Sequence, residues 1–365
     1  MSTHTIPTPV AVAAPSPAAQ LVRLLPGMSL LFGIGWLGKL LEHVFAQLRV
    51  GYPGVPFPHL EYVLWAIVLG LAISNVFGVA EVFRPGVATY ELWLKLGIVL
   101  VGTRFLMQDI VHIGGLALVL VAVELVLSLS LMSLLGYLFR LPPKLTSLLA
   151  IGSSICGVTA IIAAQGAIEP EEEDTSTAIA AILTLGAIAL FTFPAIGHAL
   201  HMSQQGYGMW AGLAVDNTAE SLVTGSLYGE EAGRWTVLAK TARSGFLGFV
   251  VLAYAVYWSS RGLAPDVPNK AQFLWRKFPK FIVGFLALSI LATAGFFSKG
   301  QLASLTNLSK WAFLPAFAGV GLRTNLRDLT AQGWRPLMVG ILGEIFIALI
   351  TLGLVYWSYS HGVAR

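Results

Sequence analysis

Residues 151–160 read Ile-Gly-Ser-Ser-Ile-Cys-Gly-Val-Thr-Ala and lie in the middle of a very apolar chain. They include two serines, a threonine, two glycines and the only cysteine. Small residues let helix backbones approach closely, and hydroxyl groups can replace lost backbone partners. In a bilayer, backbone that departs from a regular helix is tolerated only where it is buried in protein or lines a cavity. The stretch therefore predicts either part of a transport site or a helix–helix packing seam.

The composition of the chain is that of a membrane protein. Of its 365 residues, 56% are hydrophobic and only 11% are charged, whereas soluble domains carry about 25% charged residues. The 38 glycines and 10 tryptophans fit close helix packing and interfacial anchors. A single cysteine excludes an internal disulfide. We expect an all-α polytopic membrane protein in a lipid bilayer, and no nucleic-acid partner.

Apolar runs predict about eleven transmembrane helices. Residues 1–22 are rich in Ala, Pro, Thr and Ser and predict a disordered tail without a signal peptide, followed by one transmembrane domain over 23–360. The runs at 24–45, 88–108, 207–228 and 304–325 are interrupted by polar residues or glycine, which makes them the expected functional helices. The others lie at 60–83, 113–139, 144–166, 174–199, 234–260, 277–297 and 334–359.

Loop charges predict the orientation of the chain. With the N-terminus inside, the cytoplasmic loops carry most of the loop arginines and lysines, and the acidic run at 169–174 falls outside. The positive residues on the predicted inner side are Arg84, Arg140, Lys144, Arg261, Lys270, Arg276, Lys277, Arg327 and Arg335. This asymmetry predicts a cytoplasmic N-terminus, an external C-terminus and an odd number of spans.

A short motif occurs twice, 219 residues apart. Gly102, Arg104 and Asp109 recur as Gly321, Arg323 and Asp328, and each copy precedes a long apolar run with one acid, Glu124 or Glu344. The copies lie on the third and the tenth predicted span, seven apart, so they would have opposite orientations, as in the inverted repeats of secondary transporters. A five-span repeat that pairs 144–166 with 304–325 is the alternative.

Two arginines follow glycines near predicted helix ends. The guanidinium groups of Arg104 and Arg323 are suited to a bidentate grip on an oxyanion or carboxylate. The alternative is that each snorkels to the interface or pairs with the acid that follows, Asp109 or Asp328.

The densest polar cluster is Asp216-Asn-Thr-Ala-Glu220-Ser221, which apolar residues flank. Asp216 and Glu220 are four residues apart and would share a face of a helix. Two carboxylates on one face can bind Na⁺ or share a proton, and could couple transport to an ion gradient. The alternative is a solvated interfacial helix. Lys240 and Arg243 are interpreted as anchors at the start of the next span, with counter-ions to these acids as the alternative.

No motif of an enzyme or an ATP-driven pump is present. The sequence contains no Walker motif, HExxH, GxSxG or cysteine pair. We therefore expect no enzymatic activity and no cofactor other than a coupling Na⁺ or H⁺.

Four segments resemble one family, in order along the chain. Gly152-Ser-Ser-Ile-Cys-Gly157 is similar to the signature of the YeiH-type sulfate exporter family, and Leu96–Arg104, Ala178–Pro194 and Gly319–Leu326 are similar to three of its other segments. The resemblance covers roughly residues 24–359. It implies an inner-membrane secondary carrier of sulfate-like or sulfonate-derived anions. It also implies a fold like those of cation–proton antiporters and bile-acid–sodium symporters, with crossing broken helices in a core and a panel domain that forms a homodimer.

One departure from the family pattern concerns the coupling ion. Many members place a His before the acid near 216–220, whereas this chain has Asp216, Asn217 and Glu220. A hard oxygen cluster therefore replaces a group that titrates near neutral pH.

The sequence thus predicts a secondary transporter that exports sulfate, sulfite or a small sulfonate by alternating access. Transport of the anion would be coupled to Na⁺ or H⁺. The alternative is a cation/proton antiporter without an oxyanion substrate. The predicted substrate-binding residues are Ser153, Ser154, Cys156, Gly157, Thr159, Arg104, Arg323 and Asn325, and the predicted coupling-ion residues are Asp216, Asn217, Thr218, Glu220 and Ser221.

Overall fold

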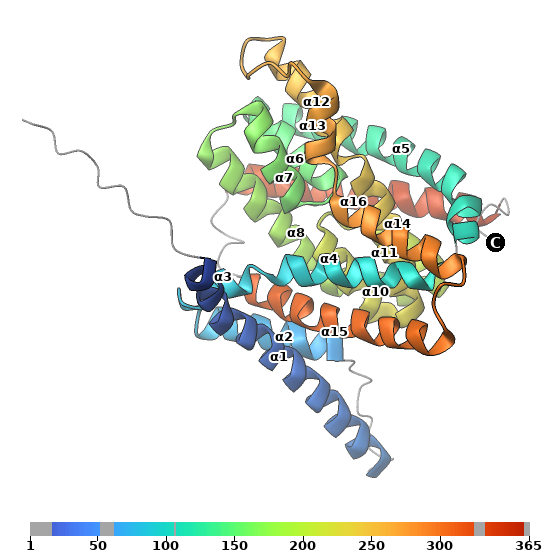
Figure 1. Ribbon diagram of the computed structural model, residues 1–365. Helices are drawn as coiled ribbons and strands as arrows, with labels where there is room; N and C mark the ends of the chain where they lie inside the picture. The colour runs from blue at the N-terminus through green and yellow to red at the C-terminus, as the bar shows by residue number, and fades with distance from the viewer. Residues whose placement is uncertain (1–16, 52–61, 106, 325–332, 361–365) are drawn as a thin grey trace, which may run out of the picture.

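The computed structural model describes residues 17–51, 62–105, 107–324 and 333–360, and these residues form helices and no strand. The helices α1 to α16 and the 3-10 turn η1 follow one another along the chain (Figure 1). Their bounds are α1 Pro17–Gly51, α2 Tyr62–Val76, α3 Arg84–Val87, α4 Tyr90–Val101, η1 Gly102–Arg104, α5 Met107–Leu138, α6 Pro143–Ser154, α7 Val158–Ile168, α8 Glu172–Ala199, α9 Gln204–Ala214, α10 Thr218–Tyr228, α11 Glu230–Gly245, α12 Leu247–Ser259, α13 Lys270–Lys277, α14 Lys280–Thr293, α15 Lys299–Arg323 and α16 Trp334–Ser360.

The all-helical expectation is confirmed for the described residues, but the number of eleven spans is not. Within the part of the chain that the structure describes, six helical segments are long and apolar enough to cross a membrane, namely Leu21–Leu48, Arg84–Arg104, Leu120–Leu138, Glu172–Ala199, Glu230–Ser259 and Trp334–Ser358. The predicted runs at 144–166 and 207–228 are each divided into two short helices. Helices α2 and α14 are shorter than the roughly 20 residues that a span needs. Helix α1 begins at Pro17, within the predicted tail.

Two apolar clusters organise the interior. The first cluster draws on α5 to α9, α11, α12 and α16. The second draws mainly on α1, α2, α4, α14 and α15, and it also takes Ala219, Leu222 and Val223 of α10. Helix α10 therefore lies where the two clusters meet, and Figure 1 shows it beneath α4 and beside α11.

The two copies of the Gly–Arg motif end helices that pack against each other in opposite directions. A side chain at Gly319 of α15 would run into Tyr90 at the start of α4, and one at Gly97 near the end of α4 would run into Phe313, earlier in α15. Contacts that run in opposite order along two helices make them antiparallel, and Figure 1 shows α4 and α15 side by side. This arrangement agrees with opposite orientations of the two copies.

Candidate functional site

Both divided helices break at the predicted polar stretches, and the breaks touch. Helix α6 ends at Ser154 and α7 begins at Val158; helix α9 ends at Ala214 and α10 begins at Thr218. Gly157 has a φ of +69°, which disfavours any side chain, and a Cβ there would lie 2.7 Å from Asn217 Oδ1. Only glycine therefore allows the two breaks to approach this closely.

The carbonyl ends of α6 and α9 are satisfied by two buried cations of α11. The Arg243 guanidinium donates to the carbonyls of Ser153, Ser154 (2.7 Å) and Leu213 (2.5 Å). The Lys240 ammonium donates to the carbonyls of Val215 (2.6 Å) and Asp216 (2.7 Å). The last carbonyls of a helix lack partners and carry partial negative charge, so a cation stabilises them.

Lys240 and Arg243 are thus not the end anchors that their sequence positions indicated. Their side chains are 1% and 0% exposed, respectively. Nor do they act only as counter-ions to Asp216 and Glu220, because their donors mainly serve backbone carbonyls. Lys240 and Arg243 lie three residues apart on α11. The signal in the sequence that could have identified their role is the presence of two charged residues within a predicted membrane span.

The amino ends of α7 and α10 open into a cavity of about 390 Å³, here called the crossing cavity. Cys156 and Thr159 from one break, and Asn217 and Thr218 from the other, contribute to its wall. The N-cap of α7, Gly157, offers no side-chain acceptor to the first amides of that helix. Helix amino ends carry partial positive charge and unpaired amides, so this wall suits an anion.

Basic side chains from three other helices complete the crossing cavity. The charged residues in its wall are Lys95, Arg276, Lys277, Lys280 and Glu91. Lys95 pairs with Glu91 at 3.1 Å, which leaves three cations without a carboxylate partner in the described wall. Burial, and then the neighbouring Arg276, lower the pKa of Lys277. The wall therefore carries net positive charge in addition to the helix amino ends.

The predicted anion-binding residues are divided between several places. Cys156 and Thr159 line the crossing cavity, and Gly157 forms the contact between the breaks. Ser153 and Ser154 lie on the opposite side of the break, 1% and 0% exposed, beside Arg243. Arg323 donates to the Tyr90 hydroxyl at 3.1 Å and stacks on its ring. Asn325 lies outside the described residues.

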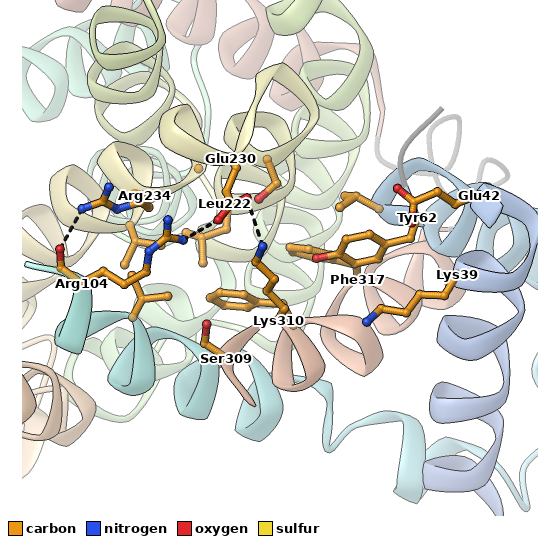
Figure 2. Close-up of a pocket in the computed structure, with 16 residues that line it drawn as sticks. Lys39, Glu42, Tyr62, Arg104, Leu222, Glu230, Arg234, Ser309, Lys310 and Phe317 are labelled. Atoms are coloured by element: carbon orange, nitrogen blue, oxygen red, sulfur yellow. Dashed lines mark hydrogen bonds and ion pairs between the residues drawn. The ribbon is translucent and has the colours of Figure 1, made fainter. Parts of the chain in front are cut away.

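Arg104 lies in a second cavity of about 340 Å³, here called the outer cavity (Figure 2). Its guanidinium pairs with Glu230 at 3.0 Å, and Lys310 of α15 pairs with the same carboxylate at 3.0 Å. Figure 2 shows Glu230 between the two cations. Arg104 and the crossing cavity are therefore not parts of one site.

The predicted coupling-ion residues also separate. Asp216 precedes the first residue of α10, so it does not share a helical face with Glu220, and that premise of a joint Na⁺ site is wrong. The Glu220 carboxylate accepts a hydrogen bond from Asn217 and lies against Gly186 of α8. The Ser221 hydroxyl donates to the Ala211 carbonyl at 2.9 Å and ties α10 to α9. Among the described residues, no group of three His, Cys, Asp or Glu side chains is placed to hold a metal ion.

Comparisons with known proteins show the family of the chain. The model of the family described as "Conserved hypothetical protein 698" matches residues 26–340. A UPF0324 membrane protein of Nitratidesulfovibrio vulgaris is 34% identical over 345 residues, 93% of this chain and 94% of the relative. A second one from that organism is 29% identical over 93% of this chain but 64% of its own length. A UPF0324 membrane protein of Clostridium tetani is 26% identical over 81% of this chain and 89% of the relative. No solved structure matches.

Proposed function

The chain belongs to the UPF0324 membrane protein family, and from that premise we propose that it is a secondary transporter of a small oxyanion or sulfonate. The crossing cavity carries the proposal. Two helix amino ends open into it and basic side chains from three further helices line it, while the opposite helix ends are already satisfied by Lys240 and Arg243. Positive electrostatic potential is thus concentrated on the side of the two helix breaks that faces the crossing cavity.

The size of the crossing cavity supports a small ligand. Its volume of about 390 Å³ is at the lower end of the roughly 300–1,000 Å³ of small-molecule sites. Sulfate, sulfite and short sulfonates present three or more acceptor oxygens, which match amide, hydroxyl, ammonium and guanidinium donors. From the loop charges and the family resemblance we propose a location in the inner membrane with the N-terminus in the cytoplasm. The direction of transport, which the sequence predicts as export, depends on how the anion is coupled to the driving ion.

The two cavities support alternating access. Ile98 and Ala219 line the crossing cavity, while Val101 and Leu222 line the outer cavity. Ile98 and Val101 are three residues apart on α4, and Ala219 and Leu222 are three residues apart on α10. About one helical turn of apolar side chains therefore separates the two cavities. A relative movement of the two apolar clusters along α10 would open this barrier from one side or the other.

A ligand screen tests the proposal. Purified protein is heated with sulfate, sulfite, thiosulfate, small sulfonates, carboxylates or bicarbonate, each with and without Na⁺. A bound ligand raises the melting temperature because it binds only the folded state. We expect one class of sulfur oxyanion to stabilise the protein and to drive counterflow of the same labelled anion in proteoliposomes.

Matched variants locate the binding site. Arg276→Gln and Lys277→Gln should each weaken anion binding, by about tenfold for a lost charge-assisted contact. Lys270→Gln is the control, because Lys270 lies on the same short helix, is exposed and does not line the crossing cavity. Ion flux that no anion changes would overturn the proposal in favour of a cation/proton antiporter.

A further inference from the structure

A cluster of five ionisable side chains, four of them buried, lies beside the two breaks, and none of the five lines the crossing cavity. Glu124 of α5, Asp216 of the second break, Lys240 and Arg243 of α11, and Glu344 of α16 interact with one another. Charged groups inside a membrane protein are costly unless they are paired, and they commonly mark ion pathways. Four different parts of the chain contribute to this cluster, so it is a feature of the tertiary structure.

The two cations do not pair with every carboxylate. Arg243 forms an ion pair with Glu124 at 3.4 Å, while its other donors reach backbone carbonyls. Lys240 donates to the carbonyls of Val215 and Asp216. No donor among the described residues satisfies the oxygens of the Asp216 and Glu344 carboxyl groups, which are buried.

The carboxyl groups of Asp216 and Glu344 are close neighbours, with the Ser153 side chain also beside Asp216. Two carboxylates cannot form a hydrogen bond unless a proton lies between them. The charges give the same answer, because three carboxyl groups and two cations leave one uncompensated negative charge. A single proton on this pair would both satisfy the hydrogen bond and neutralise the cluster.

We propose that Asp216 and Glu344 together hold one proton, and that this proton is the coupling ion of the transporter. The inference rests on the proposed transport function and identifies its driving ion as H⁺ rather than Na⁺. Lys240 and Arg243 stand directly beside the pair and repel a metal cation, whereas a proton is shared within the pair without further ligands.

The position of Asp216 explains how the proton and the anion influence each other. Asp216 directly precedes Asn217, which lines the crossing cavity, so the cluster and the anion site share one short extended segment. A negative charge on the pair repels an anion in the cavity, and the proton removes that charge. Proton and anion therefore favour each other's binding, and the effect is reciprocal. The two move in the same direction, so an inward proton gradient drives the anion inward, opposite to the export that the sequence predicts.

Proton uptake on anion binding tests the inference. Sulfate, or whichever anion stabilises the protein in the screen, is added to purified protein in weak buffer with a pH indicator. Lys277→Arg serves as the background, so that the lysine in the cavity wall does not contribute protons. At a pH high enough to remove the proton from the pair in the absence of the anion, we expect uptake that approaches about one proton per bound anion, as the linkage requires.

Variants in which one carboxyl group of the pair is replaced by an amide are compared with the parent protein. In Asp216→Asn or Glu344→Gln, two carboxylates face two cations, so the cluster is balanced without a proton. Each variant should fold, bind the anion and lose proton uptake, and a pH gradient should no longer drive its transport. Glu231→Gln makes the same chemical change at an exposed carboxyl group near the start of α11 and should keep proton uptake.

Infrared spectroscopy gives a readout that does not depend on transport. The carbonyl stretch of a protonated carboxylic acid should be present in the parent protein and absent from both variants. Anion binding without proton uptake, uptake that persists in both variants, or a strict requirement for Na⁺ would overturn the inference and leave the proposed function intact. Absence of binding and transport for every anion would instead overturn the proposed function.

Discussion

At the scale of single residues, Gly157 decides whether the two breaks can meet. Its φ of +69° and its contact with Asn217 leave no room for a Cβ. Backbone strain alone costs about 1–3 kcal/mol at such a position. We expect Gly157→Ala to lower the melting temperature and to abolish anion binding, as measured by thermal unfolding with and without ligand.

A matched substitution controls for the loss of glycine itself. Gly166 lies in the same helix, α7, with open space around the position of its Cβ. Gly166→Ala should leave binding unchanged and stabilise the protein slightly, because alanine favours the helix by up to about 1 kcal/mol. Equal effects of the two substitutions would show that the contact between Gly157 and Asn217 is unimportant.

Arg243 acts at the same scale through the shape of its side chain. Three donor nitrogens of its guanidinium reach three backbone carbonyls at the ends of α6 and α9. Lysine keeps the charge but cannot reproduce this fork. Arg243→Lys should cost at least about 1.5–3 kcal/mol for each hydrogen bond lost to the charged group, read as a lower midpoint of thermal unfolding.

An exposed arginine is the reference for that measurement. Arg261, after α12, is exposed and stacks on the Tyr257 ring. Arg261→Lys should shift the midpoint little, because substitutions at exposed positions usually change stability by less than about 0.5 kcal/mol. If Arg243→Lys behaved like Arg261→Lys, the carbonyl contacts of Arg243 would contribute nothing.

At the scale of helices, the crossing divides two membrane helices into four halves with distinct roles. The carboxyl ends of α6 and α9 face Arg243 and Lys240, and the amino ends of α7 and α10 face the crossing cavity. Side chains at the first turn of α7 should therefore affect anion binding more than side chains one or two turns further on.

Thr159 and Gln165 allow this to be measured along one helix. Thr159 lies in the first turn of α7 and lines the crossing cavity, whereas Gln165 lies near the end of that helix. Thr159→Glu places a negative charge beside the proposed anion and should eliminate binding through repulsion. Gln165→Glu should retain binding, as measured by thermal shift with the anion. Retained binding in Thr159→Glu would move the anion site away from the amino end of α7.

At the scale of the whole molecule, ion pairs link three helical segments at the outer cavity. Glu230 at the start of α11 bridges Arg104, after α4, and Lys310 of α15 (Figure 2). These side chains are partly exposed, so each pair contributes no more than about 1 kcal/mol. Such weak contacts can close a cavity and still permit it to open in every transport cycle.

Removal of the Glu230 charge should shift the protein toward an open outer cavity. Glu230→Gln loses both ion pairs, and a cysteine introduced as Ser226→Cys in the cavity wall should react several-fold faster with an impermeant thiol reagent. Glu231→Gln serves as the reference. An unchanged reaction rate would mean that the ion pairs do not hold the outer cavity closed.

The sequence by itself determined the helical membrane class and several residues around the two breaks. Of the four interrupted runs that it indicated, 207–228 is divided, whereas 24–45 lies within the continuous helix α1 and 304–323 within the continuous helix α15. These features follow from composition and local pattern, because helices need apolar runs, and glycine and hydroxyl residues mark departures from them. Cys156 and Thr159 were predicted as substrate-binding residues and Asn217 and Thr218 as coupling-ion residues, and all four line the crossing cavity.

Only the tertiary structure decided which of these residues come together. Arg104 and Arg323 match in sequence but contribute to different surroundings, and Ser153 and Ser154 face Arg243 instead of the crossing cavity. Glu344 neighbours Asp216 across 128 positions of the chain, a juxtaposition that no local pattern contains. The physical reason is that a buried charge is stabilised by whatever surrounds it in space, and packing between distant helices decides those surroundings.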